Sequence, residues 1–281
     1  MRIARFRIAD GRILHGLVEG DVVKLLADPP AGGIETWLQA GAFDEAISRT
    51  EGEIPLSAIR LLAPIAEPPK FLGLGGNYRS HLDEIAHLGI AEPTTQIWFN
   101  KQRTCVAGPF DEVVIPRLSK AVDYEVELAV VIGRRCRNVP ASHAHDVIAG
   151  YMVCNDVSAR DIQMRAQTMT LGKSFDTHGP IGPWLVTADE IADCQSLRLR
   201  TWVNGELRQD GNTSEMKYTV AQQIEELSAV FTLEPGDILA TGTPAGVGAA
   251  FQPPKFLRHG DVVRLEIDQI GVIENIFVDG T

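Results

Sequence analysis

One ten-residue run, residues 123–132, constrains both the fold and the chemistry of this chain. It reads Asp-Tyr-Glu-Val-Glu-Leu-Ala-Val-Val-Ile, which is typical of a buried β-strand. Because strand side chains alternate between faces, Glu125 and Glu127 share a face with Ala129 and Val131. Two carboxylates about 7 Å apart on a covered face repel each other and lose hydration unless a cation lies between them. The run therefore predicts either a divalent-metal site or a strand end that emerges into water.

A third carboxylate favours the metal site. Residues 150–156 read as another buried strand ending in Asn-Asp, and residues 158–161 resemble a capped helix start. Asp156 is then expected between a strand and a helix, where mixed sheets often place their chemistry. A ligand set of carboxylates without His or Cys favours Mg²⁺, Mn²⁺ or Ca²⁺ over Zn²⁺.

Length and charge exclude several classes of protein. The 281 residues are 44% hydrophobic, which is enough for one large domain or for one large domain with a small appendage. A net charge of -11 argues against binding to nucleic acid or to anionic membranes. No apolar run approaches the ~20 residues of a membrane span, and the N-terminus lacks the apolar core of a signal peptide. We therefore expect a soluble, cytoplasmic protein.

Turn signals and short β-like runs indicate the domain organisation. The first sixty-odd residues alternate as short strands, and Pro64 and Pro68-Pro69 mark a plausible boundary. We expect a small N-terminal domain over residues 1–66 and a catalytic domain over residues 67–281. In the second domain β-like runs dominate, and helical patterns occur at residues 80–88, 158–167 and 220–231. This pattern predicts a mostly β, α+β fold with a mixed sheet or flattened barrel.

Two segments carry further candidate catalytic groups. His81 and Glu84 are three residues apart on a predicted helix, so a carboxylate could orient the imidazole as a general base for water. The alternative is an ordinary surface pair. Glycines flank this helix and would allow it to move as a lid. Lys173, in a semi-apolar loop, could polarise a carbonyl or hold a carboxylate, or it could simply be solvated.

A third segment, residues 241–248, offers backbone N–H groups and hydroxyls suited to holding a carboxylate. It lacks the Gly-Lys-Ser/Thr of a phosphate-binding loop and does not open a helix, so we do not expect a nucleotide site. The chain also has no Gly-x-Ser-x-Gly, which argues against a serine hydrolase.

Taken in order, five motifs resemble the fumarylacetoacetate hydrolase family. They are residues 76–81, 123–128, 155–161, 172–177 and 241–248. The resemblance covers roughly residue 68 to the C-terminus, after a variable N-terminal domain. The chain departs from the family pattern at Gly76, where the family often has a larger residue, and at residues 101–105. Both departures lie near the expected pocket and leave the identity of the substrate open.

The resemblance implies a mixed β-sandwich roll, a homodimer and a keto-acid substrate. It also implies Mg²⁺ or Mn²⁺, with Ca²⁺ as a substitute in vitro, held by Glu125, Glu127 and Asp156. His81 and Glu84 would be the water-activating pair, and Lys173 would lie beside the metal. The remaining residues that the resemblance assigns to substrate binding are Tyr78, Arg160, Gln163 and Thr243.

The implied function is Mg- or Mn-dependent hydrolysis of a carbon–carbon bond in a β-diketo acid of the acylpyruvate or fumarylpyruvate type. The products would be pyruvate and a carboxylic acid, as in the catabolism of aromatic compounds. Three alternatives use the same chemistry: oxaloacetate decarboxylation, isomerisation of 2-hydroxyhepta-2,4-diene-1,7-dioate, and hydrolysis of 2,4-diketo-3-deoxy sugar acids. A metal-binding protein without activity is a weaker alternative, because every residue of the implied site is present.

Overall fold

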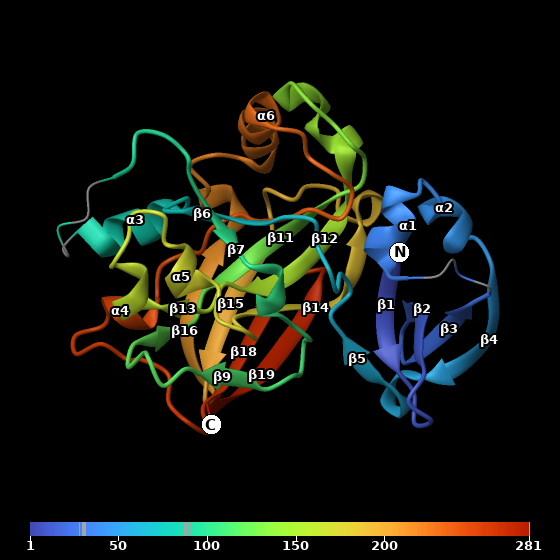
Figure 1. Ribbon diagram of the computed structural model, residues 1–281, viewed down its shortest axis with the longest axis horizontal. Coiled ribbons are helices and arrows are strands. Elements are labelled where there is room, and N and C mark those ends of the chain that lie inside the picture. The colour runs from blue at the N-terminus through green and yellow to red at the C-terminus, as the bar shows by residue number, and fades with distance from the viewer. Residues whose placement is uncertain (28, 30–31, 87–88, 90–91, 281) are drawn as a thin grey trace.

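A sheet of twelve strands runs through the molecule in the computed structural model, which describes residues 1–280 except 28, 30–31, 87–88 and 90–91 (Figure 1). Ten strands follow the order β4-β3-β2-β1-β14-β12-β11-β17-β6-β7, while β5 pairs with β1 and β8 pairs with β14. The twelve strands are β1 (Arg2–Arg7), β2 (Ile13–Glu19), β3 (Val22–Leu26), β4 (Thr50–Pro55), β5 (Arg60–Leu62), β6 (Phe71–Gly75), β7 (Ile97–Lys101), β8 (Val106–Ala107), β11 (Val126–Ile132), β12 (Ile148–Asn155), β14 (Gly179–Thr187) and β17 (Ile238–Ala240).

A second sheet of five strands packs against the first in the order β16-β15-β18-β19-β9 (Figure 1). Its strands are β9 (Val113–Ile115), β15 (Arg198–Val203), β16 (Glu206–Asn212), β18 (Val262–Ile267) and β19 (Gly271–Asp279). A short pair, β10 (Val122–Asp123) and β13 (Ser158–Ala159), forms a third sheet. The predicted mostly β, α+β sandwich-roll fold with a β-rich N-terminal region is confirmed.

Strand β11 separates two hydrophobic cores, and all seven of its residues are buried. Leu128 and Val130 pack toward the five-stranded sheet in one cluster, whereas Ala129 and Val131 belong to the cluster on the opposite face. This confirms the alternation that the sequence indicated. The strand pairs antiparallel with β12, and Val126 lies opposite Asn155.

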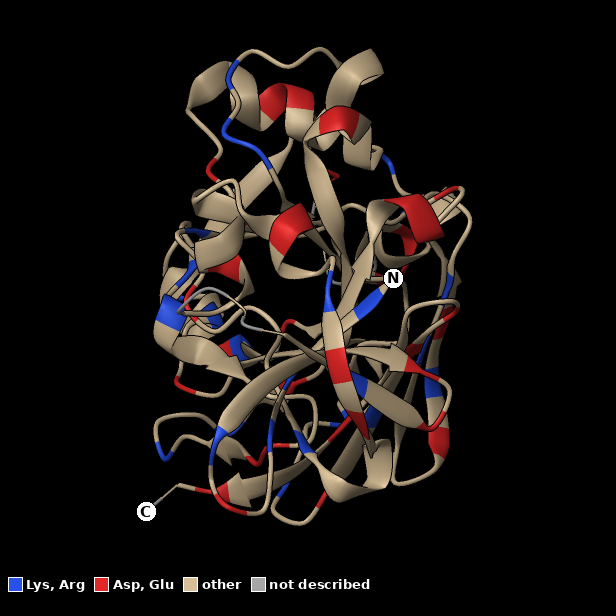
Figure 2. Ribbon diagram, turned by 90° about the vertical axis from the view of Figure 1, so that its right-hand side faces the viewer, with Lys and Arg blue, Asp and Glu red and all other residues tan. Residues whose placement is uncertain are grey.

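The N-terminal strands continue the main sheet. Strand β1 pairs antiparallel with β14 through Arg2 opposite Val186 and Ile3 opposite Leu185. Figure 2, in which this part of the chain faces the viewer, shows acidic and basic residues interspersed along its strands. The boundary between residues 66 and 67 stays a prediction.

The helices are short and lie around the sheets (Figure 1). They are α1 (Ile34–Gln39), α2 (Phe43–Ala46), α3 (Arg79–Ala86), α4 (Arg160–Gln163), α5 (Thr170–Lys173) and α6 (Val220–Val230). Six 3₁₀ turns are also present in the described chain, at Leu56–Ala58, Arg103–Cys105, Ala141–Val147, Ala188–Glu190, Thr213–Glu215 and Gly248–Ala250. Among the described residues, no helix has the length and apolar character needed to cross a membrane.

Two helix predictions agree with the structure, and one does not. Helix α6 matches the pattern at residues 220–231, and α3 matches residues 80–86, whereas residues 87–88 lie outside the described part of the chain. The prediction of a capped helix over residues 158–167 was wrong: Ser158 lies in β13 opposite Asp123, and its hydroxyl donates to the carbonyl oxygen of Asp156 instead of capping a helix. Only α4 remains of the predicted helix.

Candidate active site

Three buried carboxylates meet where β11 begins and β12 ends. Glu125 precedes β11, Glu127 lies within it, and Asp156 follows β12. The antiparallel register brings them together, and the backbone N–H of Asp156 donates to the carbonyl oxygen of Glu125 at 3.0 Å. One ligand oxygen from each residue lies within 4.8 Å of the others. These are the three residues predicted to bind the metal.

The electrostatics of this cluster fit a divalent cation. Burial raises the pKa of Glu127 well above its usual range, and the neighbouring carboxylates of Asp156 and Glu125 raise it further. Burial alone would also raise the pKa of Glu125, but Lys173 and Arg160 hold it well below the usual range. A cation would relieve the repulsion around Glu127, and an all-oxygen donor set is the one that Mg²⁺ and Mn²⁺ prefer.

Lys173 is buried against this cluster and is not solvated. It lies at the end of α5, where the sequence indicated a loop. Its ammonium donates to Glu125 Oε2 at 2.6 Å and to Asp156 Oδ2 at 2.5 Å. A Cβ on Gly172 would lie 2.4 Å from the Cα of Gln163, so the approach of α5 to α4 requires glycine at this position.

A second buried lysine, Lys101, supports the cluster from behind. Its ammonium donates to Asp156 Oδ1 at 2.7 Å and to the carbonyl oxygens of Lys173 and His178 at 2.5 and 2.9 Å. All three of its protons therefore have acceptors. The sequence analysis noted residues 101–105 only as a departure from the family pattern near the expected pocket and gave Lys101 no role, although a lysine ending the strand-like run Ile-Trp-Phe-Asn-Lys was a signal.

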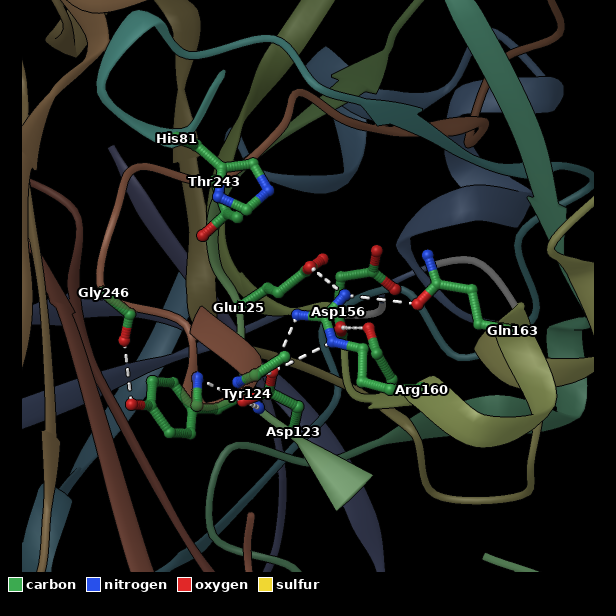
Figure 3. Close-up of polar contacts among 12 residues, drawn as sticks. His81, Asp123, Tyr124, Glu125, Asp156, Arg160, Gln163, Thr243 and Gly246 are labelled. Atoms are coloured by element: carbon green, nitrogen blue, oxygen red, sulfur yellow. Dashed lines mark hydrogen bonds and ion pairs between the residues drawn. The ribbon is translucent and has the colours of Figure 1, made fainter. Parts of the chain in front are cut away.

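Asp123 and Arg160 form a clamp beside the carboxylates (Figure 3). Arg160 Nε donates to Asp123 Oδ2 at 2.9 Å, and its Nη1 lies 2.8 Å from Glu125 Oε1. Asp123, which is fully buried, also accepts from the backbone N–H groups of Gly248 and Ala249 at 2.7 and 3.0 Å. Asp123 thus ties Arg160 to the loop after residue 247. Its role was not predicted, although its place two residues before Glu125 was a signal.

His81 and Glu84 form the expected pair on α3. His81 Nδ1 lies 3.1 Å from Glu84 Oε2, and the backbone N–H of Gly246 donates to Glu84 Oε1 at 2.7 Å. The side chains are 10% and 17% exposed, so this is not an ordinary surface pair. Gly246 has φ +103, and the hydroxyl of Tyr124 donates to its carbonyl oxygen (Figure 3). The loop is therefore fixed on both sides.

A cavity of about 440 Å³ brings most of the predicted site residues together. They are His81, Glu125, Glu127, Arg160, Gln163, Lys173 and Thr243. Figure 3 shows His81 and Thr243 on the same side of Glu125, with Gln163 beyond Arg160.

Two residues that were predicted to bind the substrate, Thr243 and Tyr78, do not present a free hydroxyl to the cavity. Thr243 lines the cavity, but its hydroxyl donates to the carbonyl oxygen of Val126 and accepts from Gln209 Nε2, at 2.9 and 2.8 Å. Tyr78 is fully buried in the core and is not among the residues that line the cavity. An isolated antiparallel bridge joins the backbone of Tyr78, just before α3, to that of Met216.

Together, the fold and the carboxylate centre define a metal-dependent enzyme built on a mixed β-sheet. The family description "Fumarylacetoacetate (FAA) hydrolase C-terminal" matches residues 70–278, and the description "Rv2993c-like, N-terminal" matches residues 1–64. The chain belongs to the fumarylacetoacetate hydrolase family.

Relatives of this chain carry different activities in their names. A mitochondrial oxaloacetate tautomerase of Rattus norvegicus is 45% identical over 223 residues, covering 79% of this chain and 70% of the rat protein. A 2-hydroxyhepta-2,4-diene-1,7-dioate isomerase from Mycobacterium marinum has a similar structure, with a TM-score of 0.80, 35% identity, and coverage of 99% of this chain and 98% of that one. A maleylpyruvate hydrolase from Sphingobium sp. SYK-6, solved with manganese(II) and pyruvate, has a TM-score of 0.80, 33% identity and 100% coverage of both chains.

Proposed function

We propose that this protein hydrolyses a carbon–carbon bond in a 2,4-dioxo acid of the acylpyruvate or fumarylpyruvate type, releasing pyruvate and a carboxylic acid. The observation that carries the proposal is the His81–Glu84 pair, because His81 lines the same cavity as Glu125 and Glu127. Hydrolysis needs a general base that acts on water, whereas decarboxylation and tautomerisation do not.

The pair is built to take a proton from water. Glu84 Oε2 accepts a hydrogen bond from the Nδ1–H of His81, which leaves Nε2 as the proton acceptor. The resulting hydroxide attacks the C4 carbonyl, and the C3–C4 bond breaks with its electron pair remaining on C3. The imidazolium returns the proton to C3, which becomes the methyl group of pyruvate. One water is consumed for each bond cleaved.

The remaining residues bind and orient the substrate. Glu125, Glu127 and Asp156 would hold a divalent cation, which would supply Lewis acidity to a bound keto acid. Lys173 adds a fixed positive charge beside these carboxylates, where negative charge develops on the pyruvyl fragment. Arg160 and Gln163 line the cavity from α4 and position the substrate.

A second candidate function is keto–enol tautomerisation of oxaloacetate. It is favoured by the name of the rat relative, which is 45% identical to this chain. The reaction moves a proton between the 2-oxo oxygen and C3 and needs no attacking water. His81 could carry that proton without acting on water.

Pyruvate release in the presence of Mn²⁺ tests the first candidate, with acetylpyruvate and fumarylpyruvate as substrates. We expect His81→Gln to lower kcat by about 100-fold or more. His143→Gln is the matched control, because His143 has the same i,i+3 geometry with Asp146 at 3.1 Å but is exposed. Loss of the enol absorbance of oxaloacetate is measured in parallel. A wild-type protein that equilibrates oxaloacetate but releases no pyruvate from either substrate would replace the first candidate with the second.

We also propose that the protein is a homodimer. Support comes from exposed apolar side chains around α4 and α5, namely Leu118, Met164 and Leu171, which are 73%, 73% and 69% exposed. They are neighbours because Ser119 donates to Asp161 on α4, and α4 packs against α5. Light scattering is expected to give a dimer mass that falls to the monomer in Leu118→Asp/Leu171→Asp. Val230→Asp, which changes an equally exposed side chain on α6, is expected to leave the dimer intact.

A further inference from the structure

The cavity at the candidate active site has two chemically distinct parts. Its polar floor consists of Glu125, Glu127, Arg160 and Lys173. Its apolar wall consists of Leu82, Ile85, Pro93, Ile97, Phe99 and Met169. A substrate held by its 2-oxo acid end at the floor would place its far end against the wall.

The apolar wall meets the polar floor at Phe99. The ammonium of Lys173 lies 4.9 Å from the ring centroid of Phe99. Farther along, the space that a Cβ on Gly76 would occupy lies 3.3 Å from Leu82 Cδ2 and 3.5 Å from Pro93 Cγ. A side chain at Gly76 would therefore crowd these two apolar groups, and the φ of +65 at this position also favours glycine. The cavity of about 440 Å³ itself leaves space for a substrate group larger than methyl.

The basic groups of the polar floor are already paired. Arg160 contacts the carboxylates of Asp123 and Glu125, and Lys173 contacts those of Glu125 and Asp156. Among the described residues that line the cavity, the only other basic side chain is His81. A carboxylate at the far end of a substrate would lose its hydration against the apolar wall without gaining a cation from the described residues that form it. An alkyl or aryl group would gain from the same burial.

We infer that the group at the far end of the substrate is apolar, so that the substrate is an alkanoyl- or aroylpyruvate and not a dicarboxylic acylpyruvate. This inference rests on the proposed function for the reaction itself. It adds that the apolar wall selects the far end of the substrate. This selection affects binding whether or not a bond is cleaved.

Matched substrates test the inference in turnover. Butanoylpyruvate and succinylpyruvate differ only in that a terminal methyl group is replaced by a carboxylate. We expect kcat/KM to be at least tenfold higher for butanoylpyruvate, and to rise about two- to fourfold per methylene from acetyl- to butanoylpyruvate. Equal or higher kcat/KM for succinylpyruvate would overturn the inference.

A charge placed in the wall should reverse this preference. Ile97 lies in β7 and is 41% exposed, so Ile97→Arg adds a cation at the cavity with little cost to folding. We expect the ratio of succinyl to butanoyl turnover to rise at least tenfold. Ile276→Arg is the control, because Ile276 is a strand residue that is 42% exposed and does not line the cavity. An unchanged ratio in Ile97→Arg would refute the role of the wall.

Binding separates failure of this inference from failure of the proposed function. If neither acylpyruvate is cleaved, the proposed function fails, and calorimetry in the presence of Mn²⁺ still tests the wall. The probes are 2-oxohexanoate and 2-oxoadipate, which again differ only in a terminal methyl or carboxylate. Tighter binding of 2-oxohexanoate, lost in Ile97→Arg, supports the apolar wall. Tighter binding of 2-oxoadipate to the wild type overturns it.

Discussion

Asp123 offers the sharpest test of how the site is held together. Its carboxylate accepts four hydrogen bonds, from the backbone N–H groups of Tyr124, Gly248 and Ala249 and from Arg160 Nε. In Asp123→Asn one oxygen becomes an NH₂ group, so two of these four donors lose their acceptor. Each buried donor left unpaired costs about 1–3 kcal/mol. Removing one partner of a buried ion pair costs about 3–5 kcal/mol.

We therefore expect Asp123→Asn to lower the free energy of unfolding by about 3–5 kcal/mol. For a chain of 281 residues this corresponds to a fall in Tm of about 5–9 °C. The assay is thermal unfolding followed by circular dichroism, with EDTA present so that bound metal does not contribute. A matched control is Asp161→Asn, because Asp161 also accepts from a side chain and a backbone N–H but is exposed.

The control change should cost at most about 1 kcal/mol, or under about 2 °C in Tm. If Asp123→Asn lowers Tm no more than Asp161→Asn does, the buried clamp does not stabilise the fold as reasoned. A further readout is KM, which should rise in Asp123→Asn because Arg160 and the loop at Gly248 lose their common anchor.

Three other predictions concern the metal, the pH and the loop. Mn²⁺ at 100 times its Kd should stabilise the wild type by about 2.7 kcal/mol, and a similar rise in Tm in Glu127→Gln would contradict the ligand assignment. Burial, with a smaller contribution from Arg5, lowers the pKa of His15 to about 4, so the unfolded state binds the extra proton as the pH falls from 6.5 to 4. Unfolding curves at several pH values should show a loss of about 3 kcal/mol over this window that His15→Phe removes and the exposed His143→Phe does not. In Gly246→Ala the new Cβ would lie 1.9 Å from the carbonyl oxygen of Arg208, so the loop must shift and kcat should fall at least tenfold. The control is Gly52→Ala, which is also at positive φ but in open space and should leave kcat unchanged. Equal kcat values in these two variants would show that the loop does not position the base.

The sequence predicted the site best where a repeating local pattern determines which side chains share a face. Alternation along residues 123–132 correctly placed Glu125 and Glu127 on one face, because the strand is buried on both sides and a slip of one residue would exchange the two cores. Asp156 followed from the end of the next buried run. The pair of His81 and Glu84 followed from helical spacing alone.

Contacts between distant segments could not be predicted in this way. Lys101 reaches Asp156 across 55 residues, and Asp123 reaches Gly248 across 125 residues. Nothing in the local spacing of either residue specifies such a partner. The helix expected at residues 158–167 failed for the same reason: strand pairing with Asp123 took the backbone of Ser158 away from the local capping pattern.

The pairing of β1 with β14 has a consequence for handling and evolution of this chain. The backbone of Arg2 and Ile3 covers the segment Leu185–Val186, and the carbonyl oxygen of Met1 accepts from the N–H of Thr187 at 2.9 Å. A shortened chain starting at residue 67 would expose that edge in the middle of a long sheet. Uncovered edges recruit strands from other molecules. The N-terminal strands therefore protect this sheet edge from aggregation. A chain without them would keep every residue that lines the cavity but would first show poor solubility.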